Sequence, residues 1–108
     1  MDYCKVTAII RLEALEAVEQ RLMAAGACGM TVTRVRGCGE WKDFYHRDAL
    51  VTHVRIEIFT HADKAEALAG LIVEEAHTGA PGDGIVAVLP VSHLWRIRTG
   101  KAGVPTEL

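Results

Sequence analysis

Three glycines surround an aspartate in the segment from residue 79 to residue 84, which consists of Gly-Ala-Pro-Gly-Asp-Gly. Because glycine adopts backbone angles that other residues avoid, such a segment can turn its amide N–H groups toward a single anion. The segment lacks the Gly-Lys-Ser/Thr ending of a Walker loop, and an apolar strand pattern follows it where that loop would begin a helix. The turn is therefore a candidate anion site, with a purely structural connection as the alternative.

Two pairs of arginines lie in segments that are typical of strands. Arg96 and Arg98 alternate with other residues, which predicts two guanidinium groups on one side of an extended segment, about 6 to 7 Å apart. That spacing suits a polyphosphate, and the arginine fork matches phosphate oxygens. Arg34 and Arg36 repeat the pattern just before Gly37-Cys38-Gly39. We predict an anion site assembled from distant segments, and the alternative is a solvated, charged edge strand.

The histidines and cysteines do not have the spacing of a metal site or of a catalytic pair. None of the patterns C-x-x-C, H-x-x-x-H and H-E-x-x-H occurs, which argues against structural zinc. Cys38 with a nearby histidine is the only candidate for nucleophilic chemistry, and it can equally be a redox sensor or an inert thiol. We therefore predict no enzyme activity, no metal site and no cofactor.

Composition excludes several classes of protein. A chain of 108 residues, 50% hydrophobic, is long enough for one core, so we expect a single domain over residues 1–108. The formal net charge of -2 argues against a nucleic-acid binder, which needs a dense basic surface. No apolar run reaches the roughly 20 residues of a membrane-spanning helix, and the start lacks the layout of a signal peptide. With three widely spaced cysteines, these features favour a cytoplasmic protein with reduced thiols.

Apolar periodicity predicts the secondary structure of the first half. Residues 4–10 alternate as in a half-buried strand, and Leu15, Val18, Leu22 and Ala25 form the apolar face of a helix that stops at Gly26. Residues 30–36 predict a second strand. The stretch from residue 40 to 50 has neither periodicity, and we expect an exposed loop there.

The second half repeats this order of elements. Val54, Ile56 and Ile58 alternate with polar residues in a third strand, and Asp63 followed by Glu66 predicts the N-cap of a second helix, which stops near Gly79. Residues 85–89 are apolar throughout, as in a strand covered on both faces, and Pro90 is expected to end it.

The order strand, helix, strand, strand, helix, strand predicts an α+β, ferredoxin-like βαββαβ sandwich in which two helices cover one face of an antiparallel sheet. Ile9, Val35 and the apolar fourth strand indicate that the second face is also buried. In so small a chain that predicts association with other subunits.

At this point the sequence resembles a known family, the PII signal-transduction proteins. The resemblance rests on segments that follow one another in order along nearly the whole chain. They are Gly29-Met30-Thr31-Val32-Thr33, Gly37-x-Gly39, Arg55-Ile56-Glu57-Ile58, Thr78-Gly79-x-x-Gly82-Asp83-Gly84 and Arg96-Ile97-Arg98-Thr99-Gly100. The last two are the most specific. The resemblance implies a homotrimer that binds ATP, ADP or AMP in clefts between neighbouring subunits and acts on a protein target.

The same resemblance assigns roles to residues. It implies that Gly82, Asp83 and Gly84 cradle phosphate and that Arg96 and Arg98 reach it. Glu57 and Phe59 match strand positions near the adenine. The rest of the cleft would be lined by Gly29, Met30, Thr31, Gly37, Cys38 and Gly39.

Three positions depart from the nitrogen-sensing members of this family. Ile85 stands in place of a phosphate-binding lysine, Glu40 in place of a phosphate-contacting arginine, and Trp41 in place of a glutamine that helps to hold magnesium and 2-oxoglutarate. Loss of two cations penalises a triphosphate most, because its charge density most needs neutralisation. We therefore expect a preference for ADP or AMP over MgATP.

The regulatory loop, residues 40–53 here, is about seven residues shorter than the long loop of the family, and we expect a flexible tail from about residue 100 to 108. The resemblance therefore points to a divergent branch, and short-loop branches are associated with carboxysomes and bicarbonate uptake or with metal efflux. It implies a transporter as protein target and allows bicarbonate as a second ligand near Gly39, Glu40 and Trp41. The alternative function is that of a CutA-like or metal-efflux-associated trimer that responds to divalent metals.

Overall fold

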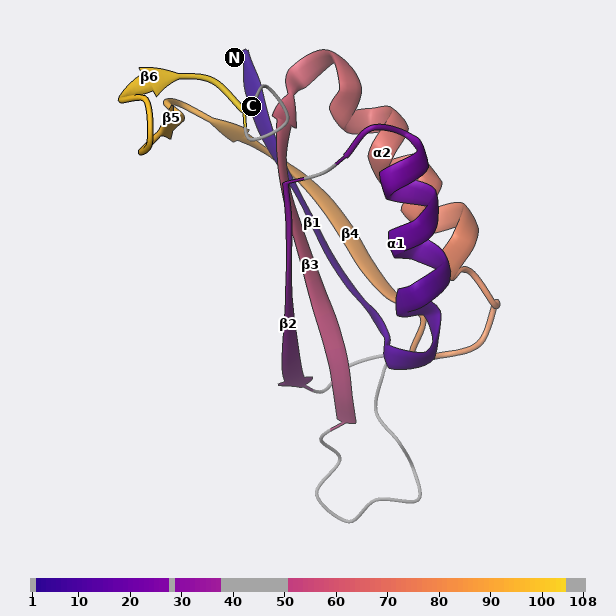
Figure 1. Cartoon of the computed structure of the whole chain (residues 1–108). Helices are drawn as coiled ribbons and strands as arrows, with labels where there is room; N and C mark the ends of the chain where they lie inside the picture. The colour runs from indigo at the N-terminus through magenta and orange to yellow at the C-terminus, as the bar shows by residue number, and fades with distance from the viewer. Residues whose placement is uncertain (1, 28, 38–50, 105–108) are drawn as a thin grey trace.

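The chain folds into a four-stranded antiparallel sheet with both helices on one face (Figure 1). The computed structural model describes residues 2–27, 29–37 and 51–104. Strand order in the sheet is β2-β3-β1-β4, and each neighbouring pair is antiparallel. The predicted α+β, ferredoxin-like βαββαβ fold is confirmed.

The elements follow the predicted order closely. They are β1 (Tyr3–Arg11), η1 (Leu12–Ala14), α1 (Leu15–Ala24), β2 (Met30–Gly37), β3 (Val51–His61), α2 (Ala62–Ala76), β4 (Gly84–Val91), β5 (Trp95–Arg96) and β6 (Lys101–Ala102). The last two form a small separate hairpin that projects beyond the sheet (Figure 1). The loop predicted from residue 40 to 50 lies outside the described residues.

The core lies between the helices and one face of the sheet. Alternate residues of the central strands form one layer of the core, and the apolar faces of the helices form the other. Its fully buried side chains include Val6, Ile10, Ile56 and Ile58 from the strands and Val18, Leu22 and Ile72 from the helices. The strict alternation follows from the two-residue period of a strand. Ala25, placed in the apolar face of the first helix from the sequence, is instead exposed just after α1 ends.

The opposite side of the sheet, which we call the open face, has no helix over it among the described residues. It carries the intervening residues of β1 and β3, among them Ile9, Glu57 and Phe59, and all three are only half-buried. Ile9 pairs there with Ile85 of β4, whose side chain is 53% exposed. In the single chain the fourth strand is therefore an edge strand with an uncovered apolar face, not a strand buried on both sides.

Two predicted boundaries were wrong. The N-cap of α2 is His61 rather than Asp63, because β3 runs straight into the helix and the Asp2 carbonyl accepts from the N–H of Ala62 at 2.9 Å. Asp63 lies in the first turn, where its charge favours the positive end of the helix. Pro90 lies inside β4 instead of ending it, since an edge strand tolerates the missing N–H.

The predicted flexible tail from residue 100 is corrected for its first part. Lys101 and Ala102 pair with β5, the N–H of Gly103 donates to the Leu94 carbonyl at 3.2 Å, and Val104 is completely buried. Burial of Val104 anchors this segment to the body of the protein. Residues 105–108 lie outside the described residues.

Candidate functional site

The glycine turn between α2 and β4 is organised by the carboxylate of Asp83. This carboxylate accepts hydrogen bonds from the N–H of Thr78 at 2.7 Å, from the N–H of Gly79 at 2.9 Å and from the hydroxyl of Thr78. The Asp83 carboxylate therefore already accepts from two backbone N–H groups of the turn, those of Thr78 and Gly79. A bound phosphate would therefore have to use the amides that follow, from Gly82 to Gly84.

Arg11 at the end of β1 closes the turn from the other side. Its guanidinium donates to the Pro81 carbonyl at 2.6 Å and to the Asp83 carboxylate at 3.2 Å. It lies so close to Gly82 that an added Cβ there would be 2.9 Å from the arginine Nη2. The small residue at position 82 thus makes room for a cation against the backbone of the turn.

Gly84 begins β4 and approaches β1 more closely than any side chain allows. Its φ is +105°, and a Cβ at this position would lie 1.7 Å from the carbonyl oxygen of Ile9. Only glycine fits both the backbone angle and the space. This close contact holds the end of the turn against β1, where Gly84 pairs with Ile10.

A buried histidine connects the turn to β3. His53 is 3% exposed, and its Nε2 lies 3.0 Å from the carbonyl oxygen of Gly82, so this nitrogen carries the proton and donates it. Arg11 and His53 are directly paired across β1 and β3. Sequence reasoning missed both residues, since no motif contains them and only the strand register brings them to the turn.

The hydrogen bonds from Thr78, through its hydroxyl and then its backbone, lower the pKa of Asp83 well below its ordinary value, with Gly79 and Arg11 contributing further. A lowered folded-state pKa means stability that is complete above the unfolded-state pKa near 4 and is lost as the pH falls below it. We expect Asp83→Asn to flatten the loss of thermal stability between about pH 4 and pH 2. Melting curves across this range measure it.

A graded variant checks that expectation. Thr78→Val removes the largest of these contributions and keeps both backbone donors, so its acid dependence should fall between those of the wild type and Asp83→Asn. An acid profile of Asp83→Asn as steep as that of the wild type would contradict the role of Asp83.

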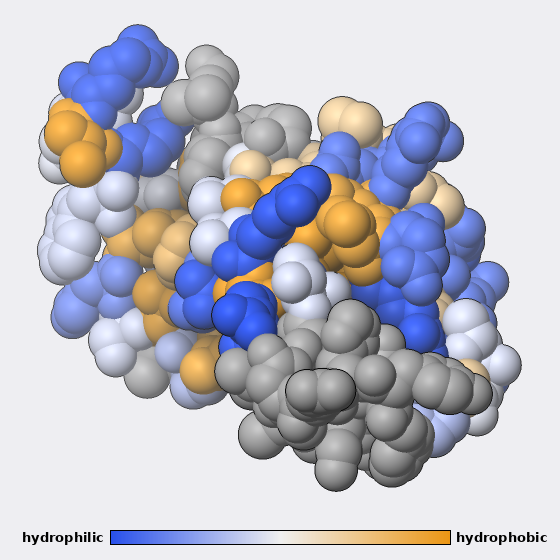
Figure 2. Space-filling view, turned by 90° about the horizontal axis from the view of Figure 1, so that it is seen from below, coloured by the Kyte–Doolittle hydropathy of each residue, from blue (hydrophilic) through white to orange (hydrophobic). Residues whose placement is uncertain are grey.

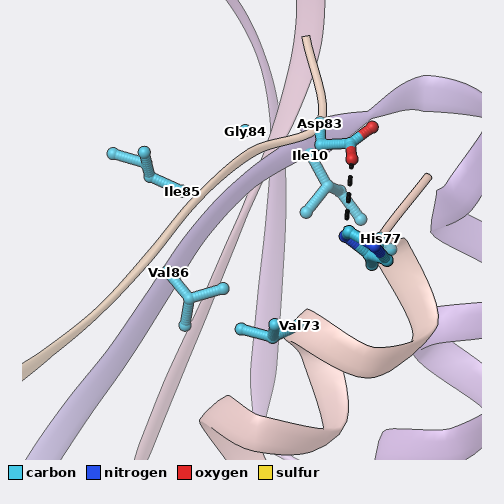
Figure 3. Close-up of a pocket in the computed structure, with 8 residues that line it drawn as sticks. Ile10, Val73, His77, Asp83, Gly84, Ile85 and Val86 are labelled. Atoms are coloured by element: carbon cyan, nitrogen blue, oxygen red, sulfur yellow. Dashed lines mark ion pairs between the residues drawn. The ribbon is translucent and has the colours of Figure 1, made fainter. Parts of the chain in front are cut away.

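Figure 3 shows a small pocket beside the turn, between the end of α2 and the start of β4. Its volume is about 150 Å³, and His77 lies across it from Asp83, with 3.9 Å between His77 Nδ1 and the Asp83 carboxylate. Val73 and Val86 line the apolar side, while Ile85 points away from Asp83 and His77. Its volume is below the roughly 300 Å³ at which small-molecule pockets begin.

The surface around the turn is mixed in character. Figure 2, which views this end of the molecule, shows apolar surface beside hydrophilic surface in the described part. Exposed large apolar side chains near the turn include Val73 at 54% and Ile85 at 53%. Arg34, exposed on β2, is level with Gly84 along the sheet, because Val54 and Ile10 connect the two through the pairing.

The other predicted residues lie elsewhere on the sheet. Met30 and Thr31 begin β2, just after Gly29, and Met30 pairs with Ile58 and Thr31 with Glu57. Met30 packs against the core, whereas Thr31 is exposed. Phe59 follows on the open face.

Glu57 is paired with cations rather than free. Its carboxylate lies 2.8 Å from the Lys5 ammonium and 3.3 Å from Arg55 Nε. The hydrogen bond from Lys5 is the main cause that lowers the pKa of Glu57, so this side chain is ionised and held in place on the open face.

The predicted placement of Arg96 and Arg98 on one extended segment was wrong. Arg96 is in β5, but residues 97–100 form a turn in which the N–H of Gly100 donates to the Arg96 carbonyl at 2.8 Å. Gly100 has a φ of +71°, which permits this reversal. Arg98 is therefore at the tip of a hairpin, next to Ile97, which is 99% exposed.

Strand register separates the predicted phosphate contacts by the length of the sheet. We call the end where Gly84 pairs with Ile10 the turn end, and the end where Val91 pairs with Tyr3 the hairpin end. Seven residues of β1 separate Tyr3 from Ile10, which is about 24 Å of strand. Figure 1 shows the turn and the β5–β6 hairpin at opposite ends.

The two groups of predicted residues divide along the same line. Gly37, Gly82, Asp83 and Gly84 lie at the turn end, and Gly29, Phe59, Arg96 and Arg98 lie toward the hairpin end. Met30 and Thr31 lie between them, level with Val6 and Thr7 near the middle of the sheet. No single phosphate reaches both groups within one chain. Cys38, Gly39, Glu40 and Trp41 lie outside the described residues, so their predicted roles stay predictions.

The chain is thus a ferredoxin-like α+β protein that carries a self-capped glycine turn at one end of its sheet and a projecting hairpin with Arg96 and Arg98 at the other. Residues 3–101 match the sequence profile of the family described as Nitrogen regulatory protein P-II. The chain belongs to this family.

Individual relatives agree. The chain is 39% identical to Nitrogen regulatory protein P-II 2 of Methanothermobacter thermautotrophicus, covering 92% of each, and 38% identical to Nitrogen regulatory protein P-II of Cereibacter sphaeroides, covering 92% of this chain and 95% of that one. It is 37% identical to the Arabidopsis thaliana P-II homolog, over 97% of this chain but 58% of the plant protein. The chain thus spans little more than half the length of that plant relative.

A solved structure shows the same fold. The crystal structure of Arabidopsis thaliana PII bound to citrate superposes with a TM-score of 0.81 and 40% sequence identity, covering 94% of this chain and 89% of that one. The relatives are regulatory signalling proteins, which agrees with the expectation that this chain regulates rather than catalyses. In the described part of the chain, no helix is both long and apolar enough to cross a membrane.

Proposed function

We propose that this chain is a trimeric regulator that binds an adenine nucleotide in clefts between its subunits. The observation that carries the proposal is the separation of the two groups of predicted contacts to opposite ends of one sheet. Residues that are meant to hold one polyphosphate can meet only if the turn end of one chain faces the hairpin end of the next. A repeated head-to-tail contact of this kind closes into a ring when the rotation between neighbouring chains divides a full turn evenly.

The uncovered side of the sheet supports such a ring. Ile9 and Ile85 are paired on the open face, and Leu89 on the same face of the edge strand β4 is 41% exposed; Val88 on the other face of this strand is 40% exposed. Exposed apolar groups gathered on one strand favour burial against another chain. The resemblance to PII proteins supplies the number three, and sedimentation equilibrium would test it.

The nucleotide preference follows from the charges at the turn. Among the described residues, Arg11 is the cation that contacts the turn. Its positive charge is neutralised by the Asp83 carboxylate and by Glu13, whose carboxylate lies 4.0 Å from the guanidinium. Ile85, the next residue after the turn, contributes no positive charge. A turn with so little net positive charge offers little to neutralise the third phosphate of ATP, which supports the proposed preference for ADP or AMP.

We therefore expect ADP and AMP to bind more tightly than ATP with magnesium in calorimetric titrations. Ile85→Lys adds a cation beside the turn and should shift the ATP-to-ADP affinity ratio toward ATP by about tenfold, the scale of one hydrogen bond to a charged group. Ile85→Met, which adds length without charge, is the control. MgATP as the tightest ligand of the wild type would contradict the proposed preference.

The regulated partner is proposed to be a transporter, with bicarbonate as a second ligand near Gly39, Glu40 and Trp41. The structural relative in complex with citrate shows that a PII protein accommodates a carboxylate anion. Calorimetry with bicarbonate in the presence of ADP tests the second ligand. For the metal-responsive alternative, no group of three or more His, Cys, Asp or Glu side chains within residues 2–27, 29–37 and 51–104 could hold a metal ion, so nothing favours it.

A further inference from the structure

A second cavity lies at the other end of α2, on the helix-covered side of the sheet. It is enclosed by the end of α1, the end of β3 and the first half of α2, and its volume is about 320 Å³. Four of its lining residues are Ala25, Gly26, Ala27 and Ala67, whose small side chains leave the space unfilled. The volume falls in the roughly 300–1,000 Å³ range of pockets that hold small molecules.

The deep wall of this cavity is aliphatic. Ile58 is 1% exposed and Leu68 is 6% exposed, and Leu71 one turn further along α2 is half-buried beside them. An aliphatic group of a few carbons placed here would leave water for an apolar surface, which is favourable in proportion to the area removed from solvent.

The rim of the cavity is polar and carries both signs of charge. Asp63 and Lys64 are consecutive, exposed residues in the first turn of α2, and Thr60 adds a hydroxyl from β3. The ion pairs among the described side chains include neither Asp63 nor Lys64. Both charges are therefore available to a ligand.

From an aliphatic wall and a rim of two opposite charges, we infer that this cavity binds a small aliphatic α-amino acid. The ammonium group would lie against Asp63, the carboxylate against Lys64, and the side chain against Ile58 and Leu68. A fatty acid would also bring its carboxylate close to Asp63, which repels it, and an alkylamine would also bring its ammonium close to Lys64, which repels it. Only a zwitterion satisfies both ends of the rim.

This cavity is distinct from the proposed nucleotide cleft. Ile58 and Thr60 point to the helix side of the sheet, whereas Glu57 points to the open face. Phe59 borders both regions. An amino acid in the cavity would thus be a second signal, carried next to the strand that the nucleotide is proposed to contact.

Calorimetric or NMR titration of the full chain with L-leucine tests the inference. We expect saturable binding, with backbone shifts at Ala27, Thr60 and Ala67. Removal of either charge from the ligand, as in 4-methylpentanoic acid or leucinamide, should weaken binding by about tenfold, the scale of a charged hydrogen bond. Ala67→Phe fills the cavity from an exposed helix position and should abolish binding, while Ala17→Phe on exposed α1 should not.

Asp63→Asn tests the contact to the ligand's ammonium group separately from the contact to its carboxylate. It should weaken leucine binding and leave 4-methylpentanoic acid unaffected or better bound, because the repelling carboxylate is gone. Equal affinity of leucine and 4-methylpentanoic acid for the wild type would overturn the inference, as would unchanged binding in Ala67→Phe. Complete displacement of leucine by ADP would also overturn it, since the cavity would then belong to the nucleotide cleft.

Discussion

Mixed trimers made from two binding-deficient variants should recover nucleotide binding. One variant carries Asp83→Ala at the turn end, and the other carries Arg96→Ala and Arg98→Ala at the hairpin end. Each alone should lose most of its affinity for ADP. Asp83→Ala removes the carboxylate that holds the turn in its ordered conformation, and the arginine changes remove charged hydrogen bonds, each of which is worth roughly tenfold or more in binding. After joint unfolding and refolding at equal amounts, about one cleft in four combines an intact turn with an intact hairpin.

The recovered fraction is measured as the stoichiometry of ADP binding. A control mixture combines wild-type chain with a chain that carries all three changes. Clefts built between chains should again recover about a quarter of the sites, whereas sites built within one chain would recover about half. Recovery of no sites by the two deficient variants would contradict an intersubunit cleft.

Gly84→Ala should destabilise the protein more than any other glycine substitution in the described part of the sheet and helices. The added Cβ would lie 1.7 Å from the Ile9 carbonyl oxygen, in a backbone conformation with φ of +105°. Relief requires β4 to move away from β1 at their first contact. We expect a loss of about 3 kcal/mol or more in the free energy of unfolding, from strain together with broken strand pairing.

Gly70→Ala is the matched control. Gly70 lies within α2, and nothing occupies the space within 4 Å of an added Cβ. Because alanine is the better helix former, this variant should be more stable by roughly 0.5–1 kcal/mol. Urea unfolding of both variants measures the difference, and a Gly84→Ala chain as stable as wild type would show that the two strands are not held at this distance.

These two predictions concern one structural unit. Gly84 holds the turn against β1, and the Asp83 carboxylate accepts hydrogen bonds from the N–H groups of the turn. Arg11 and His53 donate hydrogen bonds to the carbonyl groups of the turn. The turn is thus preorganised before any ligand arrives, and binding need not order it. Preorganisation of this kind spares a ligand the entropy cost of ordering the loop.

Much of the fold was predictable from local patterns. The alternation of Val6, Ala8 and Ile10 and the helical spacing of Val18 and Leu22 predicted the elements that the structure contains, since a two-residue or 3.6-residue period is a property of the chain itself. The errors fell at boundaries. The cap of α2 depends on the Asp2 carbonyl, which is remote in sequence and reaches Ala62 only in the folded protein.

The glycine turn was recognised from its sequence, but its contacts were not. Gly82, Asp83 and Gly84 form a local pattern whose backbone demands can be read directly. Arg11 is 70 residues from Pro81 of this turn and His53 is 29 residues from Gly82, and the pairing of β1 with β3 alone places them there. Side chains brought together by strand register leave no local signal in the sequence.

The sequence by itself therefore determined the strands, the helices, the family and the types of residue in the candidate anion site, because each is encoded by neighbours along the chain. Only the tertiary structure decided that the turn and the arginine hairpin lie at opposite ends of one sheet. The reason is the antiparallel register, which relates residues by their position along a strand and not by their distance in sequence.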